Sequence, residues 1–231
     1  MSPVSILKNI LVASLVMVVL AYGLYAAPWK PFGLQAAACL AAAICIAGAV
    51  VVVARLRKPL LVPPARNDVS AGLYTGLLWT VEIGMNNIIQ PELPLRDTLD
   101  DCFWAVIALV ILYLAIRRAM QSGKLMAGIY SGFITGLATG AVACTTGLLL
   151  VCFGMHLLTT DPANIAEWAD IGIKSGYPGI AEYFAFQTMA GALLHLIALG
   201  VVMGALLGMI GGCTGWLGGL ISSKKNYKRA G

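Results

Sequence analysis

Residues 126–155 read MAGIYSGFITGLATGAVACTTGLLLVCFGM, and none of these side chains carries a formal charge. A helix needs about 20 mostly apolar residues to cross the hydrocarbon core of a bilayer. This segment is therefore predicted to span a membrane. Five more segments have this character, at about 7–27, 34–54, 69–89, 100–117 and 186–213. The sequence predicts an all-α fold, a transmembrane bundle of six helices in a single domain over 1–231.

The composition of the whole chain agrees with this architecture. Of its 231 residues, 60% are hydrophobic and 11% are charged, whereas roughly 25% of the residues of a soluble domain are charged. An ordinary soluble protein, a disordered chain and a nucleic-acid-binding protein are therefore excluded. The lipid bilayer is the expected partner, and no cofactor is predicted.

The charged residues predict the orientation of the bundle. If the N-terminus is cytoplasmic, the cytoplasmic segments hold most basic residues: Lys8, Arg55, Arg57, Lys58, Arg66, Arg117, Arg118, Lys124, Lys224, Lys225, Lys228 and Arg229. The opposite side collects the acids Glu92, Asp97, Asp100, Asp101, Asp161, Glu167, Asp170 and Glu182. Basic loops stay in the cytoplasm. We therefore expect an integral protein of a cytoplasmic membrane, of bacterial type, with both termini inside and a basic tail over 214–231.

Two features near the membrane surfaces leave alternatives open. The first span could instead be a signal peptide cleaved near Ala26 and Ala27, although its apolar run exceeds the usual length of roughly 7–15 residues. The six cysteines form no CxxC pair and are read as small apolar residues. Cys102 and Cys152 lie near the same predicted surface, so a disulfide between them is the alternative.

The longest non-spanning stretch, 159–185, is predicted to lie on the outer side. Asp161 followed by Pro162 is typical of a helix start, with an acceptor at the cap and proline in the first turn. We expect a short helix at the outer interface, with Trp168 in the headgroup region. A lid over a ligand is the alternative interpretation.

Residues 71–84, AGLYTGLLWTVEIG, resemble residues 127–140, AGIYSGFITGLATG. Both segments begin on the predicted cytoplasmic side. The pattern therefore suggests a parallel repeat of two hairpins, formed by spans three and four and by spans five and six. Because glycine and alanine are common here, chance resemblance is the alternative.

Small residues recur every four positions in three spans, which places them on one face of each helix. Missing side chains let two helix backbones approach closely within a bilayer, as in a glycine zipper. We predict that these glycines pack the third, fifth and sixth spans together; dimerisation and a glycine-lined pore are the alternatives. The glycines are Gly72, Gly76, Gly84, Gly128, Gly132, Gly136, Gly140, Gly200, Gly204, Gly208 and Gly212.

Glu82 is the one acidic residue that falls well inside an apolar span. A carboxylate at mid-bilayer costs several kcal/mol, so such residues usually face a bundle interior or a cavity. Thr75, Glu82 and Asn86 share a helix face with Trp79, whereas Thr80, in the glycine pattern, lies nearly opposite. A helix that must bury both faces is predicted to be central in the bundle.

The depth of His195 makes it the expected partner of Glu82. At 1.5 Å per residue, Glu82 lies roughly 10 Å and His195 roughly 13 Å from the outer ends of their spans. A carboxylate and an imidazole at this depth could share a proton. Asn87 is expected to line the same cavity as Asn86. The alternatives for Glu82 are a structural polar residue that joins helices and a surface residue that reaches the headgroups.

The motifs HExxH, GxSxG and GxxxxGK[ST] are absent from the chain. We therefore predict no catalytic or metal-binding residues. Asp97 is interpreted as the cap of the fourth span, and Asp100 and Asp101 as complementing its positive N-terminal end; cation binding by this acidic cluster is the alternative. The preferred function is a small transporter or transport-associated subunit that binds a small ligand or ion at Glu82, Asn86, Asn87, His195 and Trp79. The alternative is a scaffold, assembly factor or sensor whose glycine faces contact a membrane-protein partner or a second copy. A membrane enzyme with converging outer acidic loops is the third class.

Overall fold

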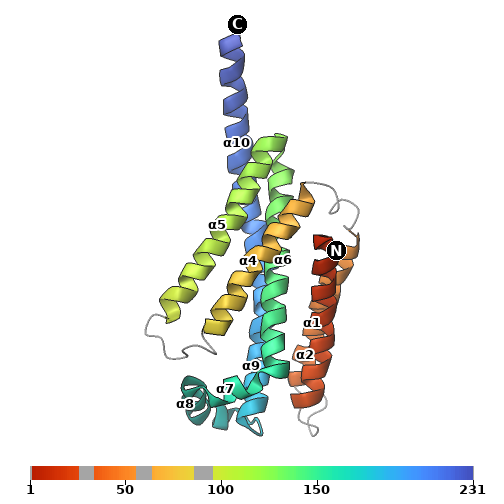
Figure 1. The fold of residues 1–231 in the computed structure, drawn as a ribbon, viewed down its shortest axis with the longest axis vertical. Coiled ribbons are helices and arrows are strands. Elements are labelled where there is room, and N and C mark those ends of the chain that lie inside the picture. The colour runs from red at the N-terminus through yellow and green to blue at the C-terminus, as the bar shows by residue number, and fades with distance from the viewer. Residues whose placement is uncertain (1, 26–33, 56–63, 86–95, 231) are drawn as a thin grey trace.

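The computed structural model describes residues 2–25, 34–55, 64–85 and 96–230, and every element in these ranges is helical (Figure 1). Five long helices come first: α1 (Pro3–Tyr25), α2 (Leu34–Arg55), α4 (Ala65–Gly84), α5 (Arg96–Ser122) and α6 (Leu125–Phe153). Short elements follow, namely α7 (Met155–Thr160), α8 (Pro162–Asp170) and η2 (Gly172–Ser175). The chain ends with α9 (Ile180–His195), the π-helix η3 (Leu196–Met203) and α10 (Gly204–Ala230).

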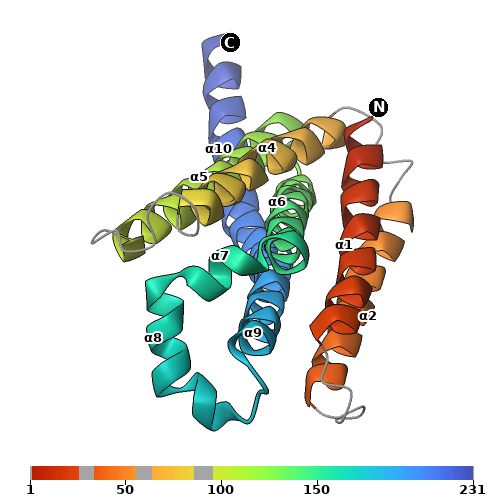
Figure 2. The ribbon, with the colours of Figure 1, turned by 60° about the horizontal axis from the view of Figure 1, so that its bottom comes forward.

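The long helices alternate in direction. In Figure 1, α1, α4 and α6 run away from the end of the bundle where both chain termini lie, and α2, α5 and α9–α10 run back toward it. We call these two ends the terminal end and the distal end. The short elements α7, α8 and η2 form an arc at the distal end, between α6 and α9 (Figure 2).

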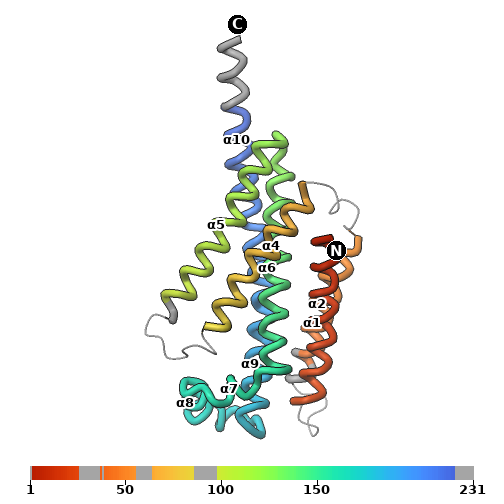
Figure 3. The backbone as a smooth tube through the Cα atoms, viewed as in Figure 1, coloured from red at the N-terminus to blue at the C-terminus, as the bar shows by residue number. Residues whose placement is uncertain are grey.

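Within the described residues, four helices are long and apolar enough to cross a membrane: Pro3–Tyr25, Thr98–Ser122, Leu125–Phe153 and Ile180–Ile221. Within α2 only the shorter stretch Cys39–Arg55 qualifies as an apolar helix. The 20-residue α4 contains Arg66, Asp68 and Glu82, which lower its hydropathy. The last span continues beyond the expected 186–213, because α9, η3 and α10 follow one another without a break (Figure 3).

The central helix is α6, which packs against α1, α4, α5, α9 and α10. The prediction that the third span is central is therefore wrong: α4 leaves one face open, where Tyr74 is 75% exposed. The reason is geometric. Gly72 and Gly76 are buried on α4 together with Glu82. Thr80, although exposed, shares a hydrogen bond of 2.9 Å with the Thr146 hydroxyl of α6. One protein-facing side is thus enough to cover both the glycines and the acid.

The arc at the distal end contains the helix start that the sequence indicates. The Asp161 carboxylate accepts a hydrogen bond from the Ala163 backbone N–H at 2.9 Å, and Pro162 occupies the first turn of α8. The Tyr183 hydroxyl, on α9, donates to the Glu167 carboxylate on α8 at 2.8 Å. The arc is therefore tied to the bundle by a side-chain bond as well as by its ends.

The six cysteines are all free thiols, including Cys102 and Cys152. The alternative of a disulfide between these two residues is therefore wrong. The Cys152 thiol instead points toward the Met17 backbone carbonyl, with a sulfur–oxygen distance of 3.5 Å. Cys102 is exposed on α5, which Figure 2 shows at a distance from this part of α6.

Candidate functional site

Buried polar side chains gather where α4 packs against α6. On α4 they are Asp68, Thr75 and Glu82, spaced seven residues apart and so on one face of the helix. On α6 they are Ser131, Thr135 and Thr139, all with no exposed surface. We call these six residues the polar seam. The seam is the main polar feature of an otherwise apolar interior.

Hydroxyl groups of α6 bond directly to the backbone of α4 along the seam. The Thr139 hydroxyl lies 3.1 Å from the Gly72 carbonyl oxygen, and the Thr135 hydroxyl lies 3.4 Å from that of Asp68. These contacts need a close approach of the two backbones. A Cβ on Gly72 would collide with the Thr135 carbonyl oxygen, and one on Gly76 would lie 2.6 Å from the Val142 Cβ.

Glu82 lies at the distal end of the seam and is 6% exposed. Its side chain is therefore covered by the protein rather than reaching outward as a surface residue would. Trp79, one turn earlier on α4, is 2% exposed. The indole Nε1–H of Trp79 finds no acceptor within the described chain. A buried donor without a partner is costly, so this N–H is a candidate donor to a ligand.

Three rings from three helices meet beside Glu82. The Trp79 ring centroid lies 4.6 Å from that of His195 on α9 and 5.0 Å from that of Trp104 on α5. Trp104 stacks on His195 at 6.0 Å. The sequence reasoning missed Trp104. Its signal was present, because Trp104, Ile107 and Ile111 recur at helical spacing and form the face of α5 that packs here.

His195 uses its δ nitrogen within its own helix. Its Nδ1 lies 2.7 Å from the Gly191 carbonyl oxygen, and a carbonyl can only accept. The hydrogen of this bond therefore resides on Nδ1. The expected pairing of His195 with Glu82 stays a prediction. The ring contacts of the imidazole are to Trp79 and Trp104.

A cavity of about 220 Å³ lies next to these rings at the distal end, between α4, α6 and α9. His195 and Ile83, the residue after Glu82, are among its lining residues. Thr188 and Asn164 supply polar groups to the same wall. Asn86 and Asn87, which were expected to line this cavity, lie outside the described residues.

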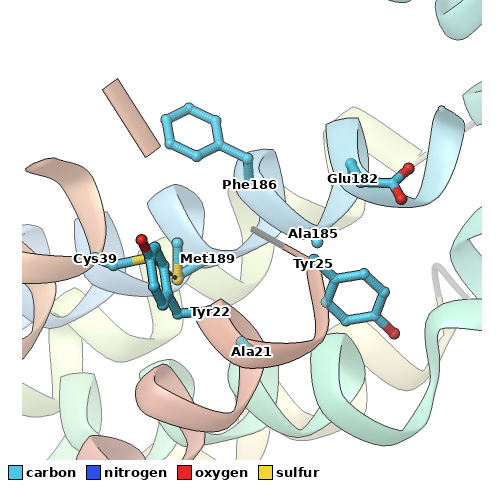
Figure 4. Close-up of a pocket in the computed structure, with 8 residues that line it drawn as sticks. All are labelled: Ala21, Tyr22, Tyr25, Cys39, Glu182, Ala185, Phe186 and Met189. Atoms are coloured by element: carbon cyan, nitrogen blue, oxygen red, sulfur yellow. Dashed lines mark hydrogen bonds between the residues drawn. The ribbon is translucent and has the colours of Figure 1, made fainter. Parts of the chain in front are cut away.

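A second cavity lies between α1, α2 and α9 and is separate from this site (Figure 4). Tyr22, Tyr25 and Phe186 contribute rings to it, and the Cys39 thiol lies 3.7 Å from the Met189 sulfur. Neither Glu82 nor His195 lines this second cavity. The two cavities lie on different sides of α6, against the α1–α2 pair and against α4.

The glycines of α6 and those of the η3–α10 segment face each other. A Cβ on Gly132 would lie 2.5 Å from the Gly208 Cα, so no larger residue fits without a shift. The contacts follow an antiparallel register: Gly128 with Gly212, Gly132 with Gly208, Gly136 with Gly204, and Gly140 with Gly200. Gly84 has no such role, because a Cβ there would have no heavy atom within 4 Å.

The terminal end of the seam holds an ion pair that the sequence reasoning missed. The Arg118 Nη2 on α5 lies 3.2 Å from both carboxylate oxygens of Asp68, which is 4% exposed. Burial raises the pKa of Asp68, and the Arg118 guanidinium and the Ser131 hydroxyl oppose this rise. The signal lay in the charge pattern, since Asp68 is the single acid among the basic residues of the predicted cytoplasmic side.

Comparisons with protein-family models, with curated proteins and with solved structures find no match to this chain. Within the described ranges, no three His, Cys, Asp or Glu side chains come together as metal ligands would.

Proposed function

We propose that the chain is a six-span membrane protein with its terminal end in the cytoplasm. The alternating directions of the long helices support six crossings. The positions of the charges support the orientation: Arg55, Arg66 and Lys124 lie toward the terminal end, whereas Asp161 and Asp170 lie toward the distal end. In this arrangement α8 lies at the outer membrane interface.

We further propose that the protein is a small transporter, or the membrane subunit of one, with its binding site around Glu82, Trp79, Trp104 and His195. The burial of Glu82 one turn from Trp79, whose ring contacts the cavity-lining His195, is the observation that carries this proposal. Ionisable residues within spans are costly and typically mark routes of ions or substrates. An ordinary packing contact between α4 and α6 needs no carboxyl group.

The site offers a small set of complementary groups to a ligand that enters from the outer side. The Glu82 carboxyl supplies negative charge or a proton, and the Nε2 of His195 supplies an acceptor when the ring is neutral. The Trp79 indole supplies the donor that has no acceptor within the described chain, and the faces of Trp79 and Trp104 favour a cation. We therefore propose a proton or another small cation as the transported or coupling species.

The proposal is tested with purified protein in liposomes on a solid-supported membrane. Jumps in pH, Na⁺ and K⁺ concentration are applied, and the charge moved across the membrane is recorded. The wild type should give a transient current for at least one of these ions, and Glu82→Gln should abolish it. Asp170→Asn removes an exposed acid from the outer arc and should leave the current unchanged.

A current that is equal in the Glu82→Gln and wild-type proteins would contradict a role for this carboxyl group. The lack of any current in the wild type would contradict transport of the three cations. Incorporation of each variant is checked by the amount of protein in the liposomes and by its elution as a single species in detergent.

The alternative of a scaffold has less support, because the glycine faces that motivated it are used within the chain. Those of α6 contact those of η3 and α10, and Gly72 and Gly76 contact α6. These surfaces are therefore not free to receive a partner. We base the proposed function on the polar site rather than on the glycines.

A further inference from the structure

A pocket of about 160 Å³ lies at the terminal end, between the first turns of α4 and the last turns of α5. It is separate from the cavity beside His195 and plays no part in the binding site proposed above. Its wall combines acidic, basic and amide groups with two apolar residues: Pro64, Asn67, Asp68, Leu114, Arg117, Arg118 and Gln121.

Arg118 is held in this pocket by a buried acid. Both contacts to Asp68 are made by the Nη2 atom of Arg118. The hydrogens on Nη1 and Nε remain available, because guanidinium has five donors in a rigid fork. The side chain of Arg118 is 15% exposed, so these hydrogens can be reached from the pocket. Asp68 thus fixes the orientation of a cation without using all of its donors.

Arg117 adds a second guanidinium to the same wall. It is exposed and has no carboxylate within ion-pair distance in the described part of the chain. Asp68 offsets one of the two positive charges, so the pocket retains a net positive charge. The amides of Asn67 and Gln121 can donate further hydrogen bonds. This combination suits an oxyanion with several acceptor oxygens, and arginine forks bind phosphate through paired hydrogen bonds.

We propose that this pocket binds a phosphate group, with the phosphodiester headgroup of an anionic phospholipid as its expected carrier. The choice of carrier rests on the orientation proposed above, which puts the pocket at the cytoplasmic membrane surface. Basic pockets between helices on this side bind anionic headgroups. Leu114 lies one turn deeper on α5 than Arg117 and Arg118, where it can contact the glycerol and the start of an acyl chain.

The test is native mass spectrometry of the detergent-purified protein titrated with phosphatidylglycerol or with phosphatidylcholine. The wild type should retain phosphatidylglycerol in preference to phosphatidylcholine. Arg117→Gln should weaken this binding about fivefold, the factor expected for one basic contact at an anionic surface. Arg66→Gln is the matched control, because Arg66 is exposed in the first turn of α4 but does not line the pocket.

Gln121→Ala provides a second variant that alters the pocket without changing its charge, and it should also weaken retention. Thermal unfolding with added inorganic phosphate separates the two sources of the ligand. Stabilisation by free phosphate that depends on Arg117 would identify a soluble phosphate as the carrier. Equal losses of phosphatidylglycerol binding in Arg66→Gln and Arg117→Gln would show that a diffuse surface charge binds the lipid, and would contradict the proposed site. Equal retention of the two lipids by the wild type would also contradict it. Because these measurements need no transport, they stand apart from the result for Glu82→Gln.

Discussion

The imidazole of His195 meets the indole of Trp79 edge to face, with ring centroids 4.6 Å apart and an angle of 73° between the ring planes. These residues are brought together by α4 and α9, two helices that both pack against α6. Trp104 closes the group from α5. The ring cluster therefore connects three helices at the depth of Glu82. A substitution of one ring should change the contacts of the other two.

The Trp79–His195 contact should be measurable as a coupling between two substitutions. We expect Trp79→Leu and His195→Gln to be non-additive by about 1 kcal/mol, the value typical of an aromatic pair beyond its burial. The free energy of unfolding in detergent is compared for the wild type, the two single variants and the double variant. If the two effects simply add, the rings are neighbours without an energetic link.

The sequence located the acid of the site but not its surroundings. The cost of a charge in hydrocarbon singles out Glu82 from the sequence alone, and the side chain is indeed covered by protein. Depth along the helices also brought His195 to the right level. Depth does not determine how a helix is rotated, however. The imidazole turned toward Trp79 and Trp104, and its Nδ1 turned back to Gly191.

The helices could be predicted from the sequence, but the packing of one helix against another could not. Apolar runs predicted helices over most of the chain, because a long apolar segment has few other stable forms in a bilayer. Which helix lies at the centre depended on how many faces each one buries. For α4 the sequence argument placed the glycine face opposite Glu82 through Thr80, whereas Gly72, Gly76 and Glu82 are all buried on this helix. Successive members of an i, i+4 pattern drift by about 40° around a helix, so one residue of the pattern does not give the position of the whole stripe.

The Gly132–Gly208 contact should tolerate no added side chain. An alanine Cβ at Gly132 would lie 2.5 Å from the Gly208 Cα and 2.8 Å from the Gly204 carbonyl oxygen. Because these are backbone atoms, a change of side-chain rotamer cannot relieve the clash. We expect Gly132→Ala to destabilise the protein by about 1–3 kcal/mol, measured as a loss of unfolding free energy in detergent.

Gly48→Ala is the matched control for this substitution. A Cβ at Gly48 on α2 has no heavy atom within 4 Å, and alanine is favoured over glycine in a helix by about 1 kcal/mol. This variant should be as stable as the wild type or slightly more stable. An equally small effect of Gly132→Ala would mean that α6 and α10 separate without cost.

The Arg118→Gln variant should become progressively less stable, relative to the wild type, as the pH rises. Removing the guanidinium takes away the main group that opposes the raised pKa of Asp68. The pKa of Asp68 in the folded state then lies further above its value in the unfolded chain, about 3.9. Such a carboxyl stabilises the fold below the unfolded pKa, and this contribution is lost as the pH rises through the folded pKa. We expect a deficit of about 3 kcal/mol at neutral pH.

The double variant Asp68→Asn/Arg118→Gln provides the control for this prediction. It has no carboxylate to desolvate, so its deficit relative to the wild type should not grow with pH in this way. Unfolding temperatures are measured in detergent from about pH 4 to about pH 8. A deficit of Arg118→Gln that stays constant over this range would show that Asp68 is not charged in the folded protein.

The orientation of the bundle can be measured with two single cysteines at opposite ends. Lys174 lies in η2 of the outer arc with a side chain that is 76% exposed, and Lys124 precedes α6 at the terminal end, where it is exposed. We expect a membrane-impermeant maleimide to label Lys174→Cys in intact cells and Lys124→Cys only after permeabilisation. The wild-type chain sets the background, because its own six thiols are free. The opposite pattern would place the basic end outside and remove the cytoplasmic headgroups from the Arg117 pocket, while the burial of Glu82 would be unaffected.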